Sequence, residues 1–449
     1  MSLGLSRLLF AQKDMRVMQI RVSEDKDYSL PQQAPTAATK SWRTSVMMRN
    51  FIGLTVIVIA LLVCLIAVEV GLAVLAPVPD PYANHKNQKN GAVNQYIRSE
   101  LPANYRVITE VDDDLPGMQG RHTFSTNSMG FRGDALAIPK PADEFRIFIV
   151  GGSTAECFYL DDSKAIHSVL QRHLQNVAPP GISIKVYNAG KSGDASDDHV
   201  SILAHRIVHL EPDLIVVFAG INDLTRSIYG YDYLHYMKEK QTRSSRSFLR
   251  SLTNDFPYFA TEFQIPRRLY YAARHISQTD TNILEEIPLK TDYGSKVALR
   301  KSVPPTDERP RVDTESYGEN IRTIVGMAKA HKIQLVLMTQ QTTWNSAVDP
   351  EAKKRLWMLY RNGKTYREEL MDEALESLNG TMRSIAGEYS IPLFDLTKLV
   401  PKSLEFFYDD VHFNVKGAMV AGTDLGRFIE PLVRAKSLRR IDKSASLIR

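Results

Sequence analysis

Four short blocks of the sequence hold residue types that could carry out acyl transfer. A serine hydroxyl becomes a nucleophile when an imidazole takes its proton, and a carboxylate three residues before that histidine can bond the other ring nitrogen. Glycine N–H groups and an asparagine amide can then donate to the oxyanion. The blocks are Gly151-Gly152-Ser153-Thr154, Asn188-Ala189-Gly190-Lys191-Ser192-Gly193, Gly220-Ile221-Asn222-Asp223 and Asp409-Asp410-Val411-His412.

Each block has a plainer interpretation when it is taken alone. A Gly-Gly-Ser-Thr segment after a strand is typical of a tight turn with a helix N-cap, and Asn222 and Asp223 could cap the following helix. Gly190 and Gly193 could belong to a phosphate-binding loop, but neither Walker nor dinucleotide spacing is present. The order of the blocks and their placement at successive strand ends favour the catalytic interpretation.

The elements that would position these blocks follow an α/β pattern. Continuously apolar strands alternate with amphipathic helices, which predicts a doubly wound parallel sheet sandwich covered on both faces. Ligands of such sheets bind beyond the carboxyl ends of the strands, where all four blocks would lie. Strands are predicted at 146–150, 184–187, 214–218, 333–339 and 392–396, and helices at 165–175, 199–209, 317–331 and 366–389.

These blocks together resemble the SGNH (GDSL-like) hydrolases. The resemblance implies that Ser153 is the nucleophile, that His412 is the base and that Asp409 orients His412. It also implies an oxyanion hole formed by the Ser153 amide, Gly193 and Asn222, an SGNH hydrolase-like fold and no cofactor. On this basis the chain is expected to be a serine esterase that works through an acyl-enzyme.

The resemblance covers residues 145–429 apart from an insertion, and the chain departs from it in two places. Gly152 stands where the best-known form of the family has Asp before the nucleophile. Asp410 follows Asp409 directly and could substitute for it, although the spacing favours Asp409. The upstream segment Asn-Ser-Met-Gly-Phe-Arg-Gly (127–133) looks like a lead-in of membrane-anchored members of the family.

Metal ligation is the competing chemical interpretation. Asp194, Asp197, Asp198 and His199 cluster after Gly193, and such groups could hold a divalent ion in a hydrolase. Consecutive acids at the start of a helix are more often N-cap and helix-dipole partners. We therefore expect no metal site.

An apolar run near the N-terminus predicts a membrane anchor. Residues 51–68 carry no charge, and the run continues past Glu69 to Ala76 before prolines end it. Eighteen helical residues span about 27 Å, close to the hydrocarbon core of about 30 Å. A buried core helix is the alternative, and the long preceding segment disfavours a cleaved signal peptide. The expected partner of residues 51–76 is the lipid bilayer.

Charge on the two sides of the run predicts the orientation. Lys40, Arg43 and Arg49 precede it, and Lys86 and Lys89 follow it, which favours an N-terminus in the cytoplasm and an extracytoplasmic catalytic domain. The predicted organisation is a mostly disordered cytoplasmic tail (1–50), a transmembrane helix (51–76), a juxtamembrane linker and cap (77–143), an SGNH hydrolase-like domain (144–435) with an insertion at about 227–310, and a basic C-terminal tail (436–449).

The insertion is rich in Tyr, Phe, Arg and Lys and offers no clear strand. It could be a lid or membrane-surface element that binds an anionic or glycan substrate. The alternative, which we favour, is a solvated helical insertion with a small core of its own. Its role stays open at the level of the sequence.

The composition excludes several classes of protein. The chain has 449 residues, of which 43% are hydrophobic and 24% charged, so it is not disordered throughout. Its net charge of +5 is too small for a nucleic-acid coat, and no nucleic-acid partner is predicted. Two cysteines, Cys64 and Cys157, exclude a disulfide scaffold.

The prediction is a membrane-anchored serine esterase that hydrolyses an O-acyl ester, with O-acetyl as one candidate, on a surface glycan or lipid. One alternative is an acyltransferase that moves the acyl group to a glycan hydroxyl. The other is a non-catalytic glycan-binding or assembly protein on the same fold, against which the complete Ser-Gly-Asn-Asp-His set argues. The sequence does not predict the oligomeric state.

Overall fold

The chain divides into two compact units, Met1–Gly71 and Leu72–Arg449. The computed structural model describes residues 37–78, 97, 100–111, 115–230, 262–273, 289–290, 293–345 and 350–447.

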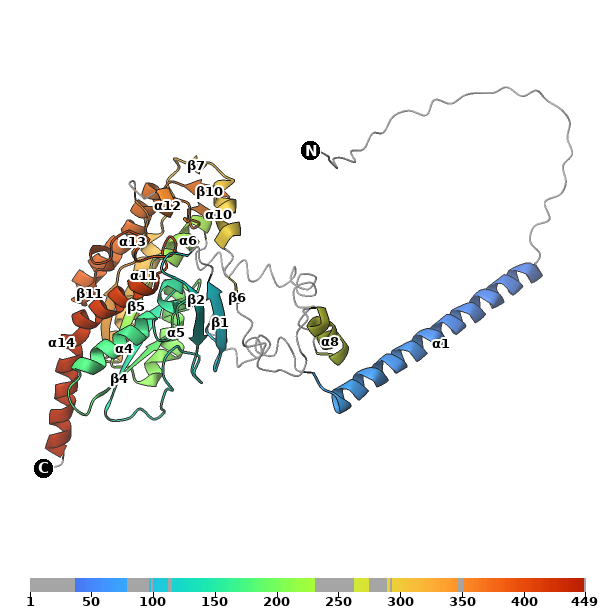
Figure 1. Ribbon diagram of the computed structural model, residues 1–449, viewed down its shortest axis with the longest axis horizontal. Coiled ribbons are helices and arrows are strands. Elements are labelled where there is room, and N and C mark those ends of the chain that lie inside the picture. Colours follow the sequence, from blue (N-terminus) through green and yellow to red (C-terminus); the bar gives the residue numbers. More distant parts are fainter. Residues whose placement is uncertain are drawn as a thin grey trace, which may run out of the picture. The chain divides into compact units, whose positions relative to one another are not determined.

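The first unit is dominated by a single long helix, α1 (Ala37–Leu75), drawn in blue in Figure 1. Its residues Met48–Leu75 are long and apolar enough to cross a membrane, and none of the tested window is buried, unlike a core helix. The structure thus supports one membrane anchor. The helix begins at Ala37, so the predicted disorder does not hold for residues 37–50, while residues 1–36 lie outside the described residues.

The second unit is built on a five-stranded sheet with the strand order β11-β8-β5-β3-β4, in which every neighbouring pair is parallel. This confirms the predicted parallel α/β sheet. The last strand has two residues rather than the five predicted. The strands are β3 (Glu144–Gly151), β4 (Ser183–Asn188), β5 (Leu214–Phe218), β8 (Gln334–Met338) and β11 (Leu393–Phe394).

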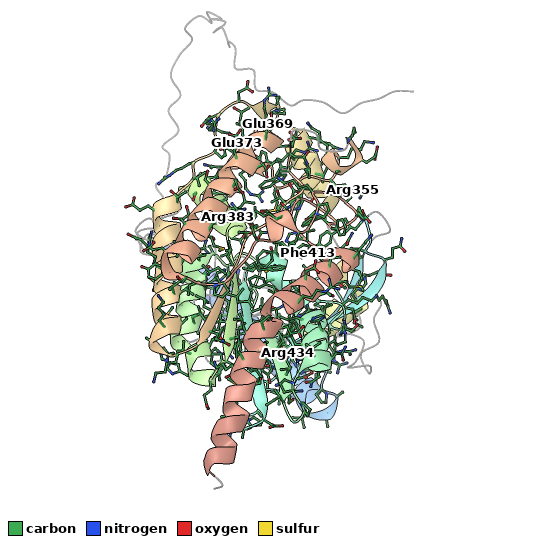
Figure 2. The ribbon with its side chains drawn as sticks, turned by 90° about the vertical axis from the view of Figure 1, so that its left-hand side faces the viewer. Arg355, Glu369, Glu373, Arg383, Phe413 and Arg434 are labelled. Carbon is green, nitrogen blue, oxygen red and sulfur yellow. The ribbon has the colours of Figure 1, made fainter. Side chains whose placement is uncertain are left out.

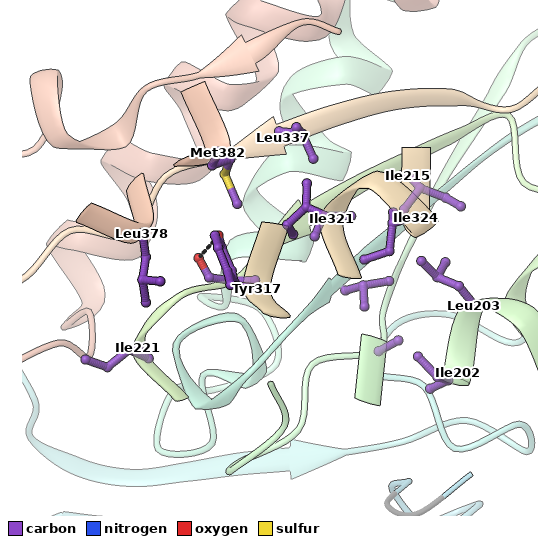
Figure 3. Packing of buried hydrophobic residues seen from close by; sticks show 14 of the residues in the cluster. Ile202, Leu203, Ile215, Ile221, Tyr317, Ile321, Ile324, Leu337, Leu378 and Met382 are labelled. Carbon is purple, nitrogen blue, oxygen red and sulfur yellow. Dashed lines mark hydrogen bonds between the residues drawn. The ribbon is translucent and has the colours of Figure 1, made fainter. Parts of the chain in front are cut away.

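Helices cover both faces of this sheet. Alternate strand residues point to opposite faces, so Phe148 and Val217 join one buried cluster whereas Ile147 and Val216 join the other. Figure 3 shows part of the first cluster, where residues of α5, α6, α11 and α13 pack on the sheet. The helices are α4 (Ile166–Val177), α5 (Ser196–His205), α6 (Ile221–Tyr229), α11 (Thr314–Ala330), α13 (Glu368–Tyr389) and α14 (Val415–Leu447).

The predicted helices are shifted by a few residues at their ends, and two regions differ more from the prediction. The helix expected at 199–209 is split into α5 and the 3-10 helix η1 (Ile207–Leu210), because Arg206 between them has φ −143° and ψ −63°. Helix α14 passes through the expected boundary at 435 and continues to Leu447. Together with α4 it covers the second face, and Arg434 lies on its exposed side (Figure 2).

The cap region contains strands that the sequence analysis did not name. β1 (Arg106–Val111) and β2 (Gly120–Ser125) form an antiparallel hairpin, and β6 (Leu289–Lys290), from the insertion, lies parallel to β1. The cap and the insertion therefore share a sheet. A second small sheet joins β7 (Pro305–Thr306), β10 (Lys364–Tyr366) and β9 (Tyr360–Arg361).

The described parts of the insertion include two helices, together with the two-residue strands β6 and β7, which the sequence did not indicate. The helices are α8 (Gln264–Ala273) and α10 (Tyr293–Lys301). The residues at 231–261, 274–288 and 291–292 lie outside the described residues. The remaining short elements among the described residues are α3 (Ser153–Glu156), α12 (Pro350–Lys353) and η2 (Leu396–Lys398).

Candidate active site

The predicted serine, histidine and aspartate meet beyond the carboxyl end of the sheet. Ser153 is the first residue of α3, directly after β3, and His412 lies shortly before α14. His412 Nε2 is 2.8 Å from Ser153 Oγ, and His412 Nδ1 is 2.7 Å from Asp409 Oδ2 and 2.9 Å from Asp409 Oδ1. This is the hydrogen-bonded order in which a carboxylate orients an imidazole and the imidazole can take a serine proton.

The two glycines before Ser153 are required by close packing. A Cβ on Gly152 would lie 2.3 Å from Asn222 Nδ2, and a Cβ on Gly151 would lie 2.6 Å from the carbonyl oxygen of Phe218. Real Cβ atoms do not approach other atoms so closely. The Asp that precedes the nucleophile in the best-known form of the family therefore has no room here, which gives the departure at Gly152 a physical reason.

Three groups were predicted as oxyanion donors, and each has an N–H available for an acceptor. The N–H of Ser153 is in the first turn of α3, where backbone donors have no partner within the helix. Gly193 has φ +87°, and its N–H makes no hydrogen bond with the described part of the chain. Asn222 Nδ2 donates to the carbonyl oxygen of Asp194 at 2.8 Å, which leaves one amide proton for another acceptor. Two of the segments that carry these groups contact the residues before Ser153, since a Cβ on Gly152 would meet Asn222 and the Lys191 N–H, in the loop of Gly193, donates to the carbonyl oxygen of Gly151.

The two consecutive acids have different environments. Asp409 Oδ1 accepts from the N–H groups of Val411 and His412, at 3.0 and 2.8 Å. Asp410 does not contact the imidazole; it accepts from Trp344 Nε1 at 2.8 Å and from the Trp357 N–H at 2.7 Å. The geometry therefore favours Asp409 as the partner of His412, as the spacing predicted.

These environments shift the two pKa values in opposite directions. Burial raises the pKa of Asp409, but the charge of His412 and hydrogen bonds from His412 and Trp357 outweigh burial and hold this pKa below its ordinary value. Burial and the charge of Asp409 raise the pKa of Asp410 to about 6. Asp409 is therefore ionised beside the imidazole at neutral pH.

Comparison with known proteins agrees with this geometry. The model of the GDSL-like lipase/acylhydrolase family matches residues 149–420, which include all four blocks. The chain belongs to this family. It is thus an ester-hydrolysing member of the GDSL-like hydrolases, as the sequence resemblance implied.

Solved structures similar to this hydrolase include an acetylxylan esterase from Geobacillus stearothermophilus, at 17% identity and a TM-score of 0.35, covering 64% of this chain and 94% of the other. Another is a lipase/acylhydrolase from Enterococcus faecalis, at 15% identity and a TM-score of 0.35, covering 64% of this chain and 96% of the other. No curated protein sequence matches the chain.

In this hydrolase the loop that carries Gly193 is tied to the helix that carries Ser153. The Ser192 hydroxyl donates to the buried carboxylate of Glu156, the last residue of α3. Burial raises the pKa of Glu156, although the hydrogen bond from Ser192 and the charges of Lys191 and Arg132 act in the opposite direction. The contact ties the loop of Gly193, a predicted oxyanion donor, to the helix of Ser153.

The upstream segment 127–133 supplies a buried arginine that supports the segment after Ser153. Arg132 is fully buried in spite of its charge, which requires that its guanidinium be fully bonded. It donates to the carbonyl oxygens of Glu156, Cys157 and Leu160 at 2.6, 2.8 and 3.0 Å, and to Asp162 Oδ1 at 2.7 Å. One buried arginine therefore bonds residues 156–162, the segment that follows Ser153.

The acids that the metal interpretation considered have other partners. Asp197 and Asp198 both form ion pairs with Arg226. Burial lowers the pKa of His199 to about 4. Within the part of the chain that the structure describes, no group of three or more His, Cys, Asp or Glu side chains is arranged to hold a metal ion.

Asn222→Ala is expected to lower kcat by about 10²- to 10³-fold with a smaller change in KM, because one oxyanion donor is lost and the effect is specific to the transition state. Steady-state hydrolysis of an aryl acetate by the full chain in detergent would measure it. The thermal melting curve is the control, since Asn222 also bonds Asp194. A kcat within fivefold of wild type would remove Asn222 from the oxyanion hole.

Asp223→Asn is expected to change how stability depends on pH. Burial raises the pKa of Asp223 to about 6, so its protonated form stabilises the fold at low pH and this contribution is lost as pH rises through 6. The variant cannot ionise. Its unfolding free energy relative to wild type should therefore be higher at pH 8 than at pH 5, by about 1 kcal/mol. Urea denaturation at both pH values measures this, and an equal difference at both would contradict it.

Proposed function

We propose that this chain is a membrane-anchored serine esterase that removes an O-acyl group from a glycan or lipid outside the cytoplasm. Its membership of an ester-hydrolysing family defines the reaction type. The observation that carries the proposal is the continuous chain of hydrogen bonds from Asp409 through His412 to Ser153.

The first half of the proposed reaction forms an acyl-enzyme. Ser153 Oγ attacks the ester carbonyl carbon while its proton passes to His412 Nε2, and Asp409 stabilises the imidazolium that results. The carbonyl oxygen becomes an oxyanion that accepts hydrogen bonds from the N–H groups of Ser153 and Gly193 and from the Asn222 amide. When the C–O bond of the ester breaks, His412 returns the proton to the leaving alcohol.

The second half repeats these steps with water. His412 takes a proton from water as the water oxygen attacks the acyl carbon, and the same three donors hold the second oxyanion. The bond from Ser153 Oγ to the acyl carbon then breaks, the proton returns to Ser153, and a carboxylic acid leaves. The chain's own residues can supply every proton transfer in this scheme.

The location of the substrate is inferred from the anchor. Residues 48–75 form a helix that is long and apolar enough to span a bilayer. The basic residues that precede the apolar run favour a cytoplasmic N-terminus, so the hydrolase would act on the opposite side. A surface glycan or a lipid headgroup carrying an O-acyl ester is the substrate class available there, and acetyl is the first acyl group to test.

Intact cells that express the full chain provide the experiment. They should release acetate from an O-acetylated oligosaccharide that cannot cross the membrane, at the same rate as lysed cells, and cells with Ser153→Ala should not. Activity in lysed cells alone would contradict the extracytoplasmic location. Release of acetate by neither preparation, with the acetyl group moved to an added glycan acceptor, would favour the acyltransferase alternative.

A further inference from the structure

One tryptophan bonds both acids of the last block. The indole Nε1–H of Trp357 donates to Asp409 Oδ2 at 3.0 Å, and the backbone N–H of the same residue donates to Asp410 Oδ2 at 2.7 Å. Trp357 lies between α12 and β9. It precedes Asp409 by 52 residues and Asp410 by 53, so no local sequence motif connects it to either acid. Asp410 thus holds the Trp357 backbone, and the Trp357 side chain holds Asp409.

The bond to Asp409 is made at Oδ2, the carboxylate oxygen nearer to His412 Nδ1. Oδ1 accepts from backbone N–H groups within the turn 409–412 itself. His412 Nδ1 lies within hydrogen-bond distance of both oxygens, 2.7 Å from Oδ2 and 2.9 Å from Oδ1. Oδ2 also accepts from the Trp357 indole, which lies outside the turn. Without the indole, Oδ2 would keep only the bond to His412 in the described chain, and the carboxylate would be held by the turn through Oδ1 alone.

We propose that Trp357 is a positioning residue, whose indole N–H holds the Asp409 carboxylate in the orientation that keeps Oδ2 on His412 Nδ1. This inference rests on the proposed function, because it assigns Trp357 a part in the proposed triad. Trp357 does not touch the serine; it acts through Asp409. A carboxylate bonded by a neutral donor keeps its charge and its geometry during the proton transfers.

The indole itself is fixed by cations from two other elements. Lys296 Nζ, on α10, lies 4.4 Å from the centroid of the Trp357 ring, and Arg361 Cζ, on β9, lies 5.0 Å from it. Such contacts restrict the ring and hold its N–H on the carboxylate. Lys296 belongs to the insertion, so the insertion contacts Trp357, the residue that bonds Asp409.

The charged and titratable groups that face the Asp409–His412 pair are few in the described structure. Asp410 is its sequence neighbour, Tyr408 stacks on the His412 ring at 5.5 Å, and Tyr159 and Arg361 interact electrostatically with Asp409. A change confined to the Trp357 N–H leaves all of these groups in place.

Trp357→Phe removes that N–H and keeps an aromatic ring. The variant should show a kcat reduced by about tenfold with KM within twofold, since a bond to a charged group is lost without any contact to substrate. The unbonded carboxylate would also stabilise the imidazolium more strongly, so the acid limb of the kcat/KM profile should move to higher pH. Wild-type kcat and an unmoved acid limb would overturn the proposal.

Trp344→Phe is the matched control. It removes an indole N–H that donates to Asp410 rather than to Asp409, and the Trp344 side chain is fully buried. It should lower the melting temperature without moving the acid limb to higher pH. An upward movement as large as that of Trp357→Phe would show that any loss of packing near the pair produces the effect, and would overturn the assignment.

A measurement on the wild-type chain decides the question if Trp357→Phe does not fold, or if no esterase activity is found. The chain has three tryptophans, so ¹⁵N-tryptophan labelling of the full chain in detergent gives three indole signals, assigned by elimination with Trp42→Phe and Trp344→Phe. The Trp357 signal should shift with pH as the Asp409–His412 pair titrates. A signal that stays constant across that titration would overturn the proposal whether or not the proposed function holds.

Discussion

Ser153→Ala is expected to reduce kcat/KM for an aryl acetate by about 10⁴-fold or more, because the proposed covalent route is lost and only oxyanion stabilisation and binding remain. The hydroxyl lies 2.8 Å from His412 Nε2, within the range in which its proton can be transferred. Alanine keeps the backbone N–H of α3, so the fold and one oxyanion donor should survive. Initial rates of the full chain in detergent would measure the loss.

Ser163→Ala is a suitable control for this substitution. Ser163 is exposed and bonds only locally to Asp161 in the described structure, so its replacement should leave both kcat and KM close to wild type. If Ser153→Ala retained a rate within tenfold of wild type while its melting temperature was unchanged, Ser153 would not be the nucleophile.

Asp409→Asn is expected to lower kcat by about 10³- to 10⁴-fold, because an amide beside His412 Nδ1 can favour the tautomer that cannot accept the serine proton. The neighbouring substitution Asp410→Asn should act mainly on stability. It weakens the acceptor for Trp344 and Trp357, but it leaves the carboxylate on the imidazole in place. Kinetics and melting curves of the two variants are measured side by side. Asp409→Asn should mainly lose kcat, whereas Asp410→Asn should mainly lose thermal stability.

The comparison of the two variants also resolves the alternative that the sequence left open. A loss of kcat in Asp410→Asn as large as in Asp409→Asn, at equal stability, would mean that Asp410 takes part in the proton transfers. A loss confined to Asp409→Asn would agree with the 2.7 Å contact between Asp409 and His412.

The gathering of the site could be predicted because it follows from the geometry of a parallel sheet. Ser153 and His412 are 259 residues apart, and Ser153 follows β3 at the carboxyl end of the sheet. Strand β5 is an unbroken apolar run and β3 holds the apolar run 147–150, so both could be located from the sequence. Strand placement indicated that the first three blocks lie at one edge, and the place of Asp409 and His412 beside them followed from the family resemblance.

The supporting residues could not be predicted in this way. Trp357 lies in a loop without periodicity, and nothing in its sequence neighbourhood indicates Asp409 as a partner. Arg132 was visible only as part of the lead-in segment 127–133, since its bonds to residues 156–162 leave no local pattern. The pairing of β6 with β1 involves two residue pairs, too few for alternation to be recognised.

The central claim is that Ser153 carries the acyl group during the reaction. Brief mixing of the full chain in detergent with 4-nitrophenyl acetate, followed by acid quenching and tryptic digestion, tests it most directly by mass spectrometry. The account predicts an acetyl group on Ser153, within the peptide spanning residues 147–164, and none on that peptide in Ser153→Ala. Nitrophenol release at the wild-type rate by Ser153→Ala, or acetylation of a different residue in a burst that matches turnover, would contradict it.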